Sequence, residues 1–450
     1  MLKFIKLPFY FLFILITSSC VTAQKFQHGV DNMVVTSNYS KALQILNSKP
    51  NVYGKKNKLL YLLDKGYVLH LSERFNESVY TLANGKKVFD ELYTKSLSNI
   101  ASTWILNDYA APYRGEDFES VLINIFQSLN YLMLGKYEDS LVEAREVDSK
   151  LKAINLQYKS GQKNVYKEDA FARLLMGILY EISNTPADFN DAFISYEKAF
   201  EIYKNEYSQN YNLSIPEILK ENLLTTADYM GTSEFNQYRK LFEETNFISL
   251  KAKNSKAEVY LIQYNGISPI KVESFLPVPL PDGYIIKIAF PKYQKRYYGA
   301  ARSLFLAQNF RGDTFETYTE TGEDIGAIAI KNLESRRVRT IAKSIARSAG
   351  RYIIERKQEE TIRKKHGSDT AGLFKFLSNM FNLFVERADL RCWKTLPDEI
   401  RIARLILDPG KYDFGVKNFN SEGRYLGEFD LGKISLSAGE KKFYLIHTVR

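Results

Sequence analysis

Residues 121–147 read VLINIFQSLNYLMLGKYEDSLVEAREV, and this stretch decides the fold of the first half of the chain. Apolar side chains in its first part fall on one helix face: Leu122, Ile125, Phe126, Leu129 and Met133. Their recurrence every three or four residues predicts an amphipathic helix. A second such helix follows Gly135-Lys136, with apolar residues at Tyr137, Leu141, Ala144, Val147 and Leu151. The stretch therefore predicts two helices joined by a short turn.

The same helix pair recurs before and after this stretch. Small and aromatic residues stand at the offsets that tetratricopeptide units use where two helices cross closely. They are Gly66, Phe75, Ser78, Leu82 and Gly85 in one unit, Tyr131, Gly135, Tyr137, Ser140 and Ala144 in the next, and Gly177, Tyr180, Phe189, Ala192, Tyr196 and Ala199 in the last. The units lie further apart than the about 34 residues of a regular array. They predict either a curved stack with an open groove or an irregular helical bundle without one.

After the helices the pattern changes to a period of two residues, which is typical of strands. A strand containing Val259 and Leu261 ends at Asn265-Gly266, a hairpin-turn sequence. Further strands are predicted at residues 271–275, 284–290, 303–306, 400–407, 412–417, 425–429, 434–436 and 442–449. The Pro-rich run 277–281 is expected to be extended at a sheet edge. Short strands separated by turns favour an antiparallel sandwich.

These patterns predict an α+β chain in which a tetratricopeptide-like helical domain precedes a β-sandwich-like domain. The expected parts are the helical domain at residues 31–227, a polar connector at 228–256, and the β-rich domain at 257–450 with a helical insertion at 325–388. A length of 450 residues is sufficient for these cores.

Residues 1–20 have the pattern of a lipoprotein signal peptide. Lys3 and Lys6 precede an apolar run, residues 7–16, that is too short to cross the hydrocarbon of a bilayer. Small residues then precede Cys20, as a lipoprotein signal peptidase requires. We therefore expect Cys20 to carry acyl chains, such as palmitate, that insert in one leaflet.

The mature chain would begin at Cys20, with residues 21–30 as a tether. The alternative is cleavage after Ala23, which would leave Gln24 first and the protein without lipid. Once Cys20 is lipidated, Cys392 is a lone thiol, so no intrachain disulfide is expected. We expect this thiol to be buried beside the neighbouring tryptophan.

The residues give little support for catalysis. The four histidines, His28, His70, His366 and His447, have no spacing to cysteines or carboxylates that would make a metal site. No glycine-rich phosphate loop and no nucleophile elbow is present. We therefore expect a binding protein and not an enzyme, without metal or cofactor. The net charge of +10 indicates a basic soluble protein or affinity for an anionic partner, and export argues against nucleic acid.

Two loops have an unusual composition. The first, at residues 107–117, contains Asp108, Tyr113, Arg114, Glu116 and Asp117. Its arginine and acidic residues can form a charge-assisted network, and Asp117 can cap the following helix. The second, at residues 387–397, contains Asp389, Arg391 and Trp393. Each loop is interpreted as a structural clamp or, alternatively, as a recognition site.

The largest local excess of positive charge lies at residues 331–365. This predicted helix includes Arg336, Arg339, Lys343 and Arg347. These residues form either a solvated face or a contact with anionic lipid or glycan. The next predicted helix, residues 372–388, is rich in Phe and Leu. We expect it to be buried under the sandwich, with membrane contact as the alternative.

Three parts of the chain resemble a known family. They are NDYAAPYRGEDFESVLINIFQSLNYLMLGKYEDSLVEAREV at residues 107–147, FLPVPLP at 275–281, and RADLRCWKTLPDEIRIARL at 387–405 followed by PGKYDFGV at 409–416. In this order they resemble a family of uncharacterised Gram-negative lipoproteins with tetratricopeptide-like helices. That family has Thr and Ser where this chain has Leu390 and Cys392. The resemblance implies a periplasm-facing lipoprotein with a function in the envelope or the cell wall. Members of the family are often encoded near a lipoprotein activator of penicillin-binding proteins. The resemblance implies no catalytic residues.

We expect, from these observations, a lipid-anchored adaptor of the cell envelope that holds a protein partner in the groove of the helix pairs. Its expected place is the outer membrane, facing the periplasm, in cell-wall or outer-membrane biogenesis. Val21 after the cysteine, in place of an acidic residue, favours the outer membrane. One alternative is a peptidoglycan- or glycan-binding lipoprotein that uses the C-terminal β domain. A third reading is an enzyme with an unprecedented site.

Overall fold

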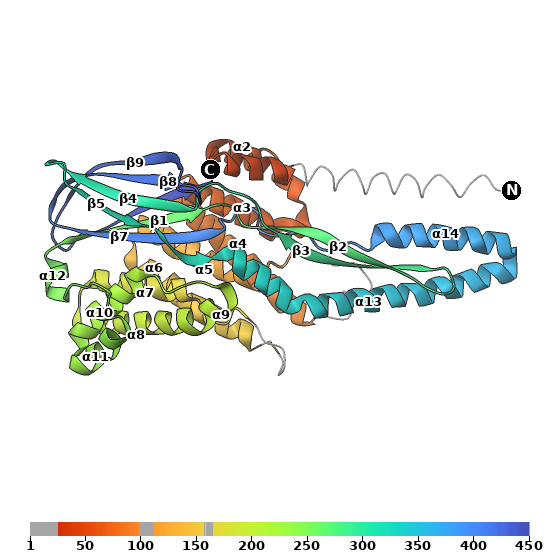
Figure 1. The fold of residues 1–450 in the computed structure, drawn as a ribbon. Helices are drawn as coiled ribbons and strands as arrows, with labels where there is room; N and C mark the ends of the chain where they lie inside the picture. Colours follow the sequence, from red (N-terminus) through yellow and green to blue (C-terminus); the bar gives the residue numbers. More distant parts are fainter. Residues whose placement is uncertain (1–25, 99–110, 157, 159–164, 450) are drawn as a thin grey trace.

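The helices and strands of the chain form three layers (Figure 1). The computed structural model describes residues 26–98, 111–156, 158 and 165–449. An array of helices forms the first layer, and two four-stranded sheets form the other two. An arm of one β-hairpin and two helices projects from this body. The chain is thus mixed α and β, with helices preceding a strand-rich region, as the sequence predicts.

Successive helix pairs make up the helical layer. After a helix at residues 26–35 come α2 (Tyr39–Ser48), α3 (Lys58–Leu71), α4 (Phe75–Ser98), α5 (Asp117–Met133), α6 (Tyr137–Asn155), α7 (Ala170–Ser183), α8 (Pro186–Ile202), α10 (Glu217–Met230) and α11 (Thr232–Leu241). Shorter turns of helix lie at Pro50–Tyr53, Lys55–Asn57, Tyr203–Tyr207, Ser208–Tyr211 (α9) and Leu250–Asn254 (α12). The predicted pairs α3/α4, α5/α6 and α7/α8 are confirmed. The array also continues past residue 227, because α10 and α11 form a further pair against α8.

Small residues lie where the paired helices touch. A Cβ atom at Gly66 of α3 would collide with Leu82 of α4, and one at Gly177 of α7 would collide with Tyr196 of α8. In α5 and α6 the close approach is made by Ser128 and Ser140, each of which donates a hydrogen bond to the other's carbonyl, at 2.8 and 2.7 Å. The offsets that predicted the pairs therefore mark their points of contact.

The two sheets pack face to face. Sheet I has the order β10 (Lys441–Thr448), β1 (Ala257–Asn265), β7 (Glu399–Leu407), β6 (Glu320–Asp324), and sheet II has the order β5 (Thr314–Tyr318), β4 (Arg302–Asn309), β8 (Gly410–Phe419), β9 (Tyr425–Leu436). Their shared core includes Val259, Leu261, Phe305, Leu405 and Val416. All neighbouring strands are antiparallel except β1 and β10, which are parallel, so the last strand of the chain lies beside the first strand of the sheet.

The inner side of the helix pairs is filled by sheet I. Six apolar residues of this sheet belong to the same hydrophobic core as the helices: Tyr260, Ile262, Tyr264, Ile400, Ile402 and Phe443. Across this boundary the ring of His70 on α3 lies 2.6 Å from the Tyr264 hydroxyl on β1. The groove that we expected to be open for a partner is therefore occupied by the chain's own strands.

A buried cluster of charges also joins the helical layer to sheet I. The ammonium of Lys253 lies 2.5 Å from the carboxylate of Glu181 on α7 and 3.2 Å from that of Glu258 on β1. Arg404 of β7 pairs with Glu258 at 3.0 Å, and Lys441 of β10 contacts the same carboxylate. Burial opposes the ionisation of Glu258, but the surrounding cations hold its pKa well below the usual value. Helices and sheet therefore share one core.

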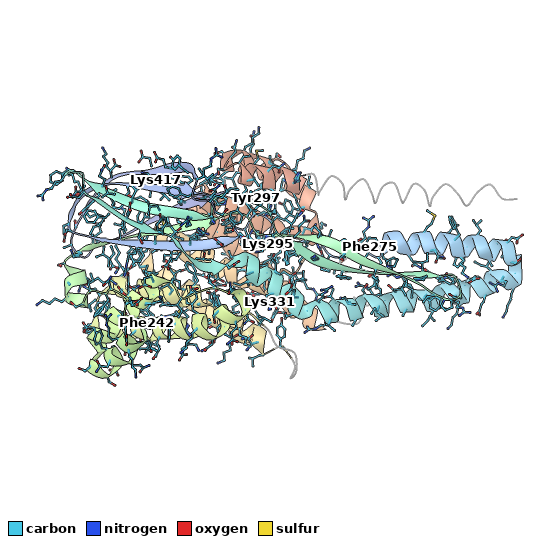
Figure 2. The ribbon with its side chains drawn as sticks, in the orientation of Figure 1. Phe242, Phe275, Lys295, Tyr297, Lys331 and Lys417 are labelled. Atoms are coloured by element: carbon cyan, nitrogen blue, oxygen red, sulfur yellow. The ribbon has the colours of Figure 1, made fainter. Side chains whose placement is uncertain are left out.

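The arm consists of β2 (Ile270–Pro279), β3 (Ile285–Gln294), α13 (Ile325–His366) and α14 (Ser368–Val385). β2 and β3 pair only with each other, as a two-stranded antiparallel sheet, and α13 and α14 pack against β3. With its 42 residues, α13 is about 63 Å long at about 1.5 Å per residue. In Figure 1 the arm extends far beyond the body, and Figure 2 shows Phe275 of β2 on it.

Some strand predictions are wrong. Asn265-Gly266 turns the chain without making a hairpin, because β1 pairs with β10 and β7 and not with β2. The two short strands predicted at 425–429 and 434–436 form the single strand β9, and β5 and β6 were not predicted. The Phe-rich helix is not buried under the sandwich, because α14 lies on the arm. In the described part of the chain, no helix combines the length and the apolar character needed to span a membrane.

Candidate functional site

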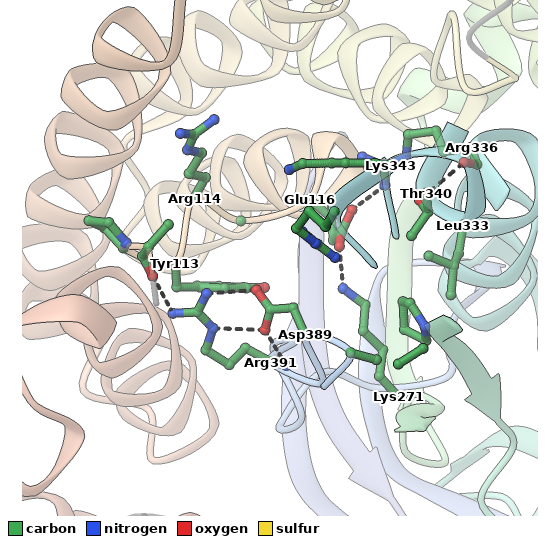
Figure 3. Close-up of a pocket in the computed structure, with 17 residues that line it drawn as sticks. Tyr113, Arg114, Glu116, Lys271, Leu333, Arg336, Thr340, Lys343, Asp389 and Arg391 are labelled. Carbon is green, nitrogen blue, oxygen red and sulfur yellow. Dashed lines mark hydrogen bonds and ion pairs between the residues drawn. The ribbon is translucent and has the colours of Figure 1, made fainter. Parts of the chain in front are cut away.

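The two unusual loops meet at one cavity of about 260 Å³, where the arm joins the body (Figure 3). Its walls come from five segments of the chain: a loop, the strands β2 and β3, the helix α13 and a second loop. They are the loop residues Ala111, Pro112, Tyr113, Arg114, Gly115 and Glu116, the strand residues Lys271, Ala289 and Pro291, the α13 residues Leu333, Arg336, Thr340, Lys343 and Arg347, and the loop residues Ala388, Asp389 and Arg391. The cavity therefore brings together Arg114 and Asp389, which are more than 270 positions apart in the chain. We call it the basic cavity.

Glu116 is the centre of the ion pairs around the basic cavity. Its carboxylate contacts Lys271 of β2 and Arg336 of α13, and Arg336 also donates to Asn332. Burial opposes the ionisation of Glu116, but the charges of Arg336 and Lys271 outweigh it and hold the pKa of the carboxyl well below its usual value. The carboxylate is therefore charged, and it ties the start of α5 to both parts of the arm.

The prediction that Asp117 caps the following helix is wrong by one residue. Glu116 is the N-cap of α5, and its backbone N–H donates to the Glu119 carboxylate at 2.9 Å. Asp117 is the first residue of the helix and accepts a hydrogen bond from the Tyr158 hydroxyl at 2.6 Å. Both acidic residues lie near the helix N-terminus, where negative charge is favourable.

The second loop is held by Arg391. Its guanidinium makes a two-pronged contact with Asp389, at 2.8 and 2.6 Å, and donates to the carbonyl of Ala111 at 3.0 Å. It also donates to Asn57 at 3.0 Å and lies over the ring of Tyr113. Arg391 therefore connects the two loops directly, which agrees with the interpretation of both as a structural clamp.

Trp393 lies outside the basic cavity, in the core behind it. Its backbone N–H donates to the buried Glu119 at 2.7 Å, and its indole N–H donates to Thr395 at 3.0 Å. Thr395 in turn donates to Asp64 of α3 at 2.9 Å. Burial raises the pKa of the Asp64 carboxyl to about 7. Cys392 is buried as expected, and burial raises the pKa of its thiol to about 11.

The basic helix contributes three of its four singled-out residues to the basic cavity. Arg336, Lys343 and Arg347 line it, and Arg347 pairs with the buried Glu386 at 3.0 Å. Arg339 is not among them, since its guanidinium lies over the ring of Tyr158. Lys271 and Glu386 could not be singled out from the sequence, because each lies in an ordinary context within its own segment. Each gains its importance only when the arm folds back on the loops.

Positive charge exceeds negative charge around the basic cavity. The lining contains six basic side chains, Arg114, Lys271, Arg336, Lys343, Arg347 and Arg391, and two acidic ones, Glu116 and Asp389. Arg114 is exposed, makes no ion pair with any residue in the described part of the chain, and extends away from the Arg391–Asp389 pair in Figure 3. The arrangement can attract a carboxylate or phosphate group of a ligand.

Metal binding has no comparable arrangement in the described ranges. No group of three or more His, Cys, Asp or Glu residues there could hold a metal ion. His70 lies between Asn130 and Tyr264, at 2.7 and 2.6 Å, and burial lowers its pKa to about 4, so the ring is neutral in the core. Asp108 and Cys20, both singled out from the sequence, lie outside the described residues.

No family model matches the chain, and no curated protein shows significant similarity to it.

Proposed function

We propose that the protein is a non-catalytic, lipid-anchored adaptor of the cell envelope, and that the basic cavity binds an acidic segment of a protein partner. The observation that carries this proposal is the excess of basic side chains in a cavity built from five segments of the chain. Because the inner side of the helix pairs is occupied by sheet I, we propose the basic cavity, and not the helical groove, as the partner site.

The geometry of the basic cavity supports recognition of carboxylates. Four of its six basic residues are arginines, whose planar fork suits two-pronged contact with a carboxylate. Glu116 and Asp389 hold Arg336 and Arg391 in place, so these cations are ordered before a ligand arrives. A preorganised site loses less conformational entropy on binding. The cavity is therefore suited to an anionic side chain presented by a partner.

The membrane anchor rests on the sequence pattern before Cys20. We propose that acyl chains on Cys20 hold the protein at the outer membrane with its body in the periplasm. The resemblance to periplasm-facing lipoproteins supports the same placement, and with it a role in cell-wall or outer-membrane biogenesis.

The proposal is tested by fluorescence anisotropy of a labelled oligo-glutamate peptide titrated with the mature chain carrying Cys20→Ser. We expect salt-sensitive binding that falls at least tenfold in the double variant Arg114→Glu/Lys343→Glu. A matched charge reversal at Arg311 and Arg424, both exposed in turns between strands of sheet II and absent from the cavity, should leave binding unchanged. Equal losses in both variants, or no binding by the wild type, would count against the proposal. Competition by inorganic phosphate shows whether phosphate is bound as well.

Peptidoglycan or glycan binding is the second candidate, because peptidoglycan also carries carboxylates. The basic cavity needs both loop 111–116 and the arm, so the C-terminal part alone does not contain it. The test is therefore sedimentation of the whole mature chain with purified sacculi. Pelleting that is lost in Arg114→Glu/Lys343→Glu would favour the glycan, and absence of pelleting would favour the protein partner.

A further inference from the structure

Helix α14 on the arm has the reverse of the usual polarity. Among residues 368–382, whose side chains the structure describes, the buried ones are small or polar: Ala371, Ser378 and Asn382. Five large apolar side chains point outward instead, each between 43 and 60 % exposed: Leu373, Phe376, Leu377, Met380 and Phe381. Their spacing of three and four residues places them on one face of the helix. We call these five residues the apolar face of α14.

Polar contacts fix this orientation of α14. Asn379 accepts a hydrogen bond from the Ile285 N–H and donates one to the Gly283 carbonyl, both at 3.0 Å. Asn382 donates to Glu355 of α13 at 2.8 Å, and Lys375 contacts the carbonyl of Asp282. The helix is therefore held to the arm by its polar side. The apolar face is therefore an outer surface of the folded arm.

No described part of the body covers the apolar face of α14. The arm extends beyond the body in Figure 1, and further apolar side chains are exposed along it, at Phe275 and Leu276 of β2, which are 54 and 56 % exposed. Exposed apolar areas of this kind mark binding sites for proteins or membranes. The charges beside the face decide between these occupants.

The tip of the arm is basic. The last turn of α13 carries Arg363, Lys364, Lys365 and His366, all exposed, and Arg356 and Lys357 precede them. Their acidic neighbours are fewer: the buried Glu359 pairs with Arg363 at 2.6 Å, and Glu360 and Asp369 are exposed. An apolar helix face beside exposed lysines and arginines is the arrangement of an interfacial membrane helix, whose cations meet anionic headgroups.

We propose that the apolar face of α14 inserts into the surface of an anionic phospholipid bilayer, with the basic tip of the arm on the headgroups. The helix would lie in the plane of the membrane without crossing it. This inference is independent of the basic cavity. It adds a second attachment to the acyl anchor proposed at Cys20.

The positions of the arm and of the start of the described chain are compatible with both attachments on one membrane. The helix at 26–35 lies at the end of the body from which the arm projects (Figure 1). Five residues lie between Cys20 and the start of that helix, and extended chain covers about 3.3–3.6 Å per residue. The start of the described chain and the arm therefore lie at the same end of the body.

The test uses flotation with vesicles of phosphatidylcholine alone and of phosphatidylcholine with phosphatidylglycerol. The protein is the mature chain with Cys20→Ser, so that the acyl anchor makes no contribution. We expect flotation with the anionic vesicles, at least tenfold weaker in Phe376→Ser/Phe381→Ser. The matched control is Tyr297→Ser/Phe310→Ser, which removes two exposed aromatic side chains from the body and should not change flotation.

Charge and insertion are measured separately. Lys364→Glu/Lys365→Glu should remove the preference for phosphatidylglycerol, whereas the cavity variant Arg114→Glu/Lys343→Glu should retain flotation. A tryptophan placed by Phe376→Trp should shift its emission to the blue on vesicle addition, and one placed by Tyr297→Trp should not. Flotation that does not depend on Phe376 and Phe381 would overturn the inference. So would a dimer that requires these residues and binds no vesicles, since the face would then pair two copies of the chain.

Discussion

Replacing Glu116 by Gln removes the negative charge that holds the arm to the helical layer. In the structure this carboxylate contacts Lys271 and Arg336, whose side chains are 5 and 24 % exposed. Glutamine has the same shape and can still accept one hydrogen bond, but it no longer neutralises either cation. The variant therefore leaves a buried ammonium without a counter-charge, while Arg336 keeps its contact with Asn332.

The size of the loss follows from the burial of Lys271. Removing one partner of a buried ion pair costs about 3–5 kcal/mol, because the remaining charge stays out of water. An exposed pair is worth about 0–1 kcal/mol. Arg74 and Glu77 form such a pair on the surface, at 47 and 56 % exposure, so Glu77→Gln is the matched control. We expect Glu116→Gln to lower the free energy of unfolding by about 3 kcal/mol or more.

Urea unfolding followed by circular dichroism measures both variants. The midpoint should fall for Glu116→Gln with an unchanged slope, and it should hardly move for Glu77→Gln. The double variant Glu116→Gln/Lys271→Met should lose less free energy of unfolding than its two single variants lose together, because it removes both members of this ion pair. Equal midpoints for the Glu116 and Glu77 variants would refute the claim that a buried ion pair joins arm and body.

Three further predictions concern other parts of the chain. The pKa of Asp64 in the folded chain is raised to about 7, so the stabilising protonated form is lost as the pH rises. The free energy of unfolding of Asp64→Asn, measured with urea, should therefore rise by about 3 kcal/mol relative to that of the wild type between about pH 5 and pH 8. A difference between the two proteins that does not change with pH would contradict this. Gly177→Ala, whose Cβ would collide with Tyr196, should lower thermal stability by about 1–3 kcal/mol, whereas Gly350→Ala, with open space around it, should not lower it. Labelled palmitate should be incorporated by the wild type and not by Cys20→Ala, and a mature N-terminus at Gln24 would exclude the anchor.

The helix pairs could be predicted because their information is local. Gly66, Ser140 and Gly177 stand at offsets fixed by the geometry of two crossing helices, and each lies at a contact in the structure. The strands near the C-terminus could also be located from their alternation and from the turns between them. What these patterns do not contain is which strand pairs with which. The parallel pair of β1 and β10 joins residues almost 200 positions apart, and no local rule specifies it.

The basic cavity was predicted in its pieces and not as a whole. The composition of the two loops singled out five residues that the structure brings together in the lining of the cavity: Tyr113, Arg114, Glu116, Asp389 and Arg391. Lys271 could not be found in this way, since a single lysine in a strand is ordinary until the fold places a carboxylate beside it. The outward orientation of α14 was missed for a related reason. An apolar stripe indicates a buried face in most helices, and only the polar residues opposite it, Asn379 and Asn382, indicate that the helix is attached by its other side.

The most direct test of the proposed function is site-specific photo-cross-linking in living cells. A photoreactive residue at Thr340 lies in the wall of the basic cavity without changing its charge, and one at Phe310 lies exposed in the turn between β4 and β5. The proposal predicts a defined cross-linked protein from position 340 alone, which disappears when Lys343→Glu and Arg114→Glu are added. The same products from both positions, or products from position 340 that persist after charge reversal, would contradict it.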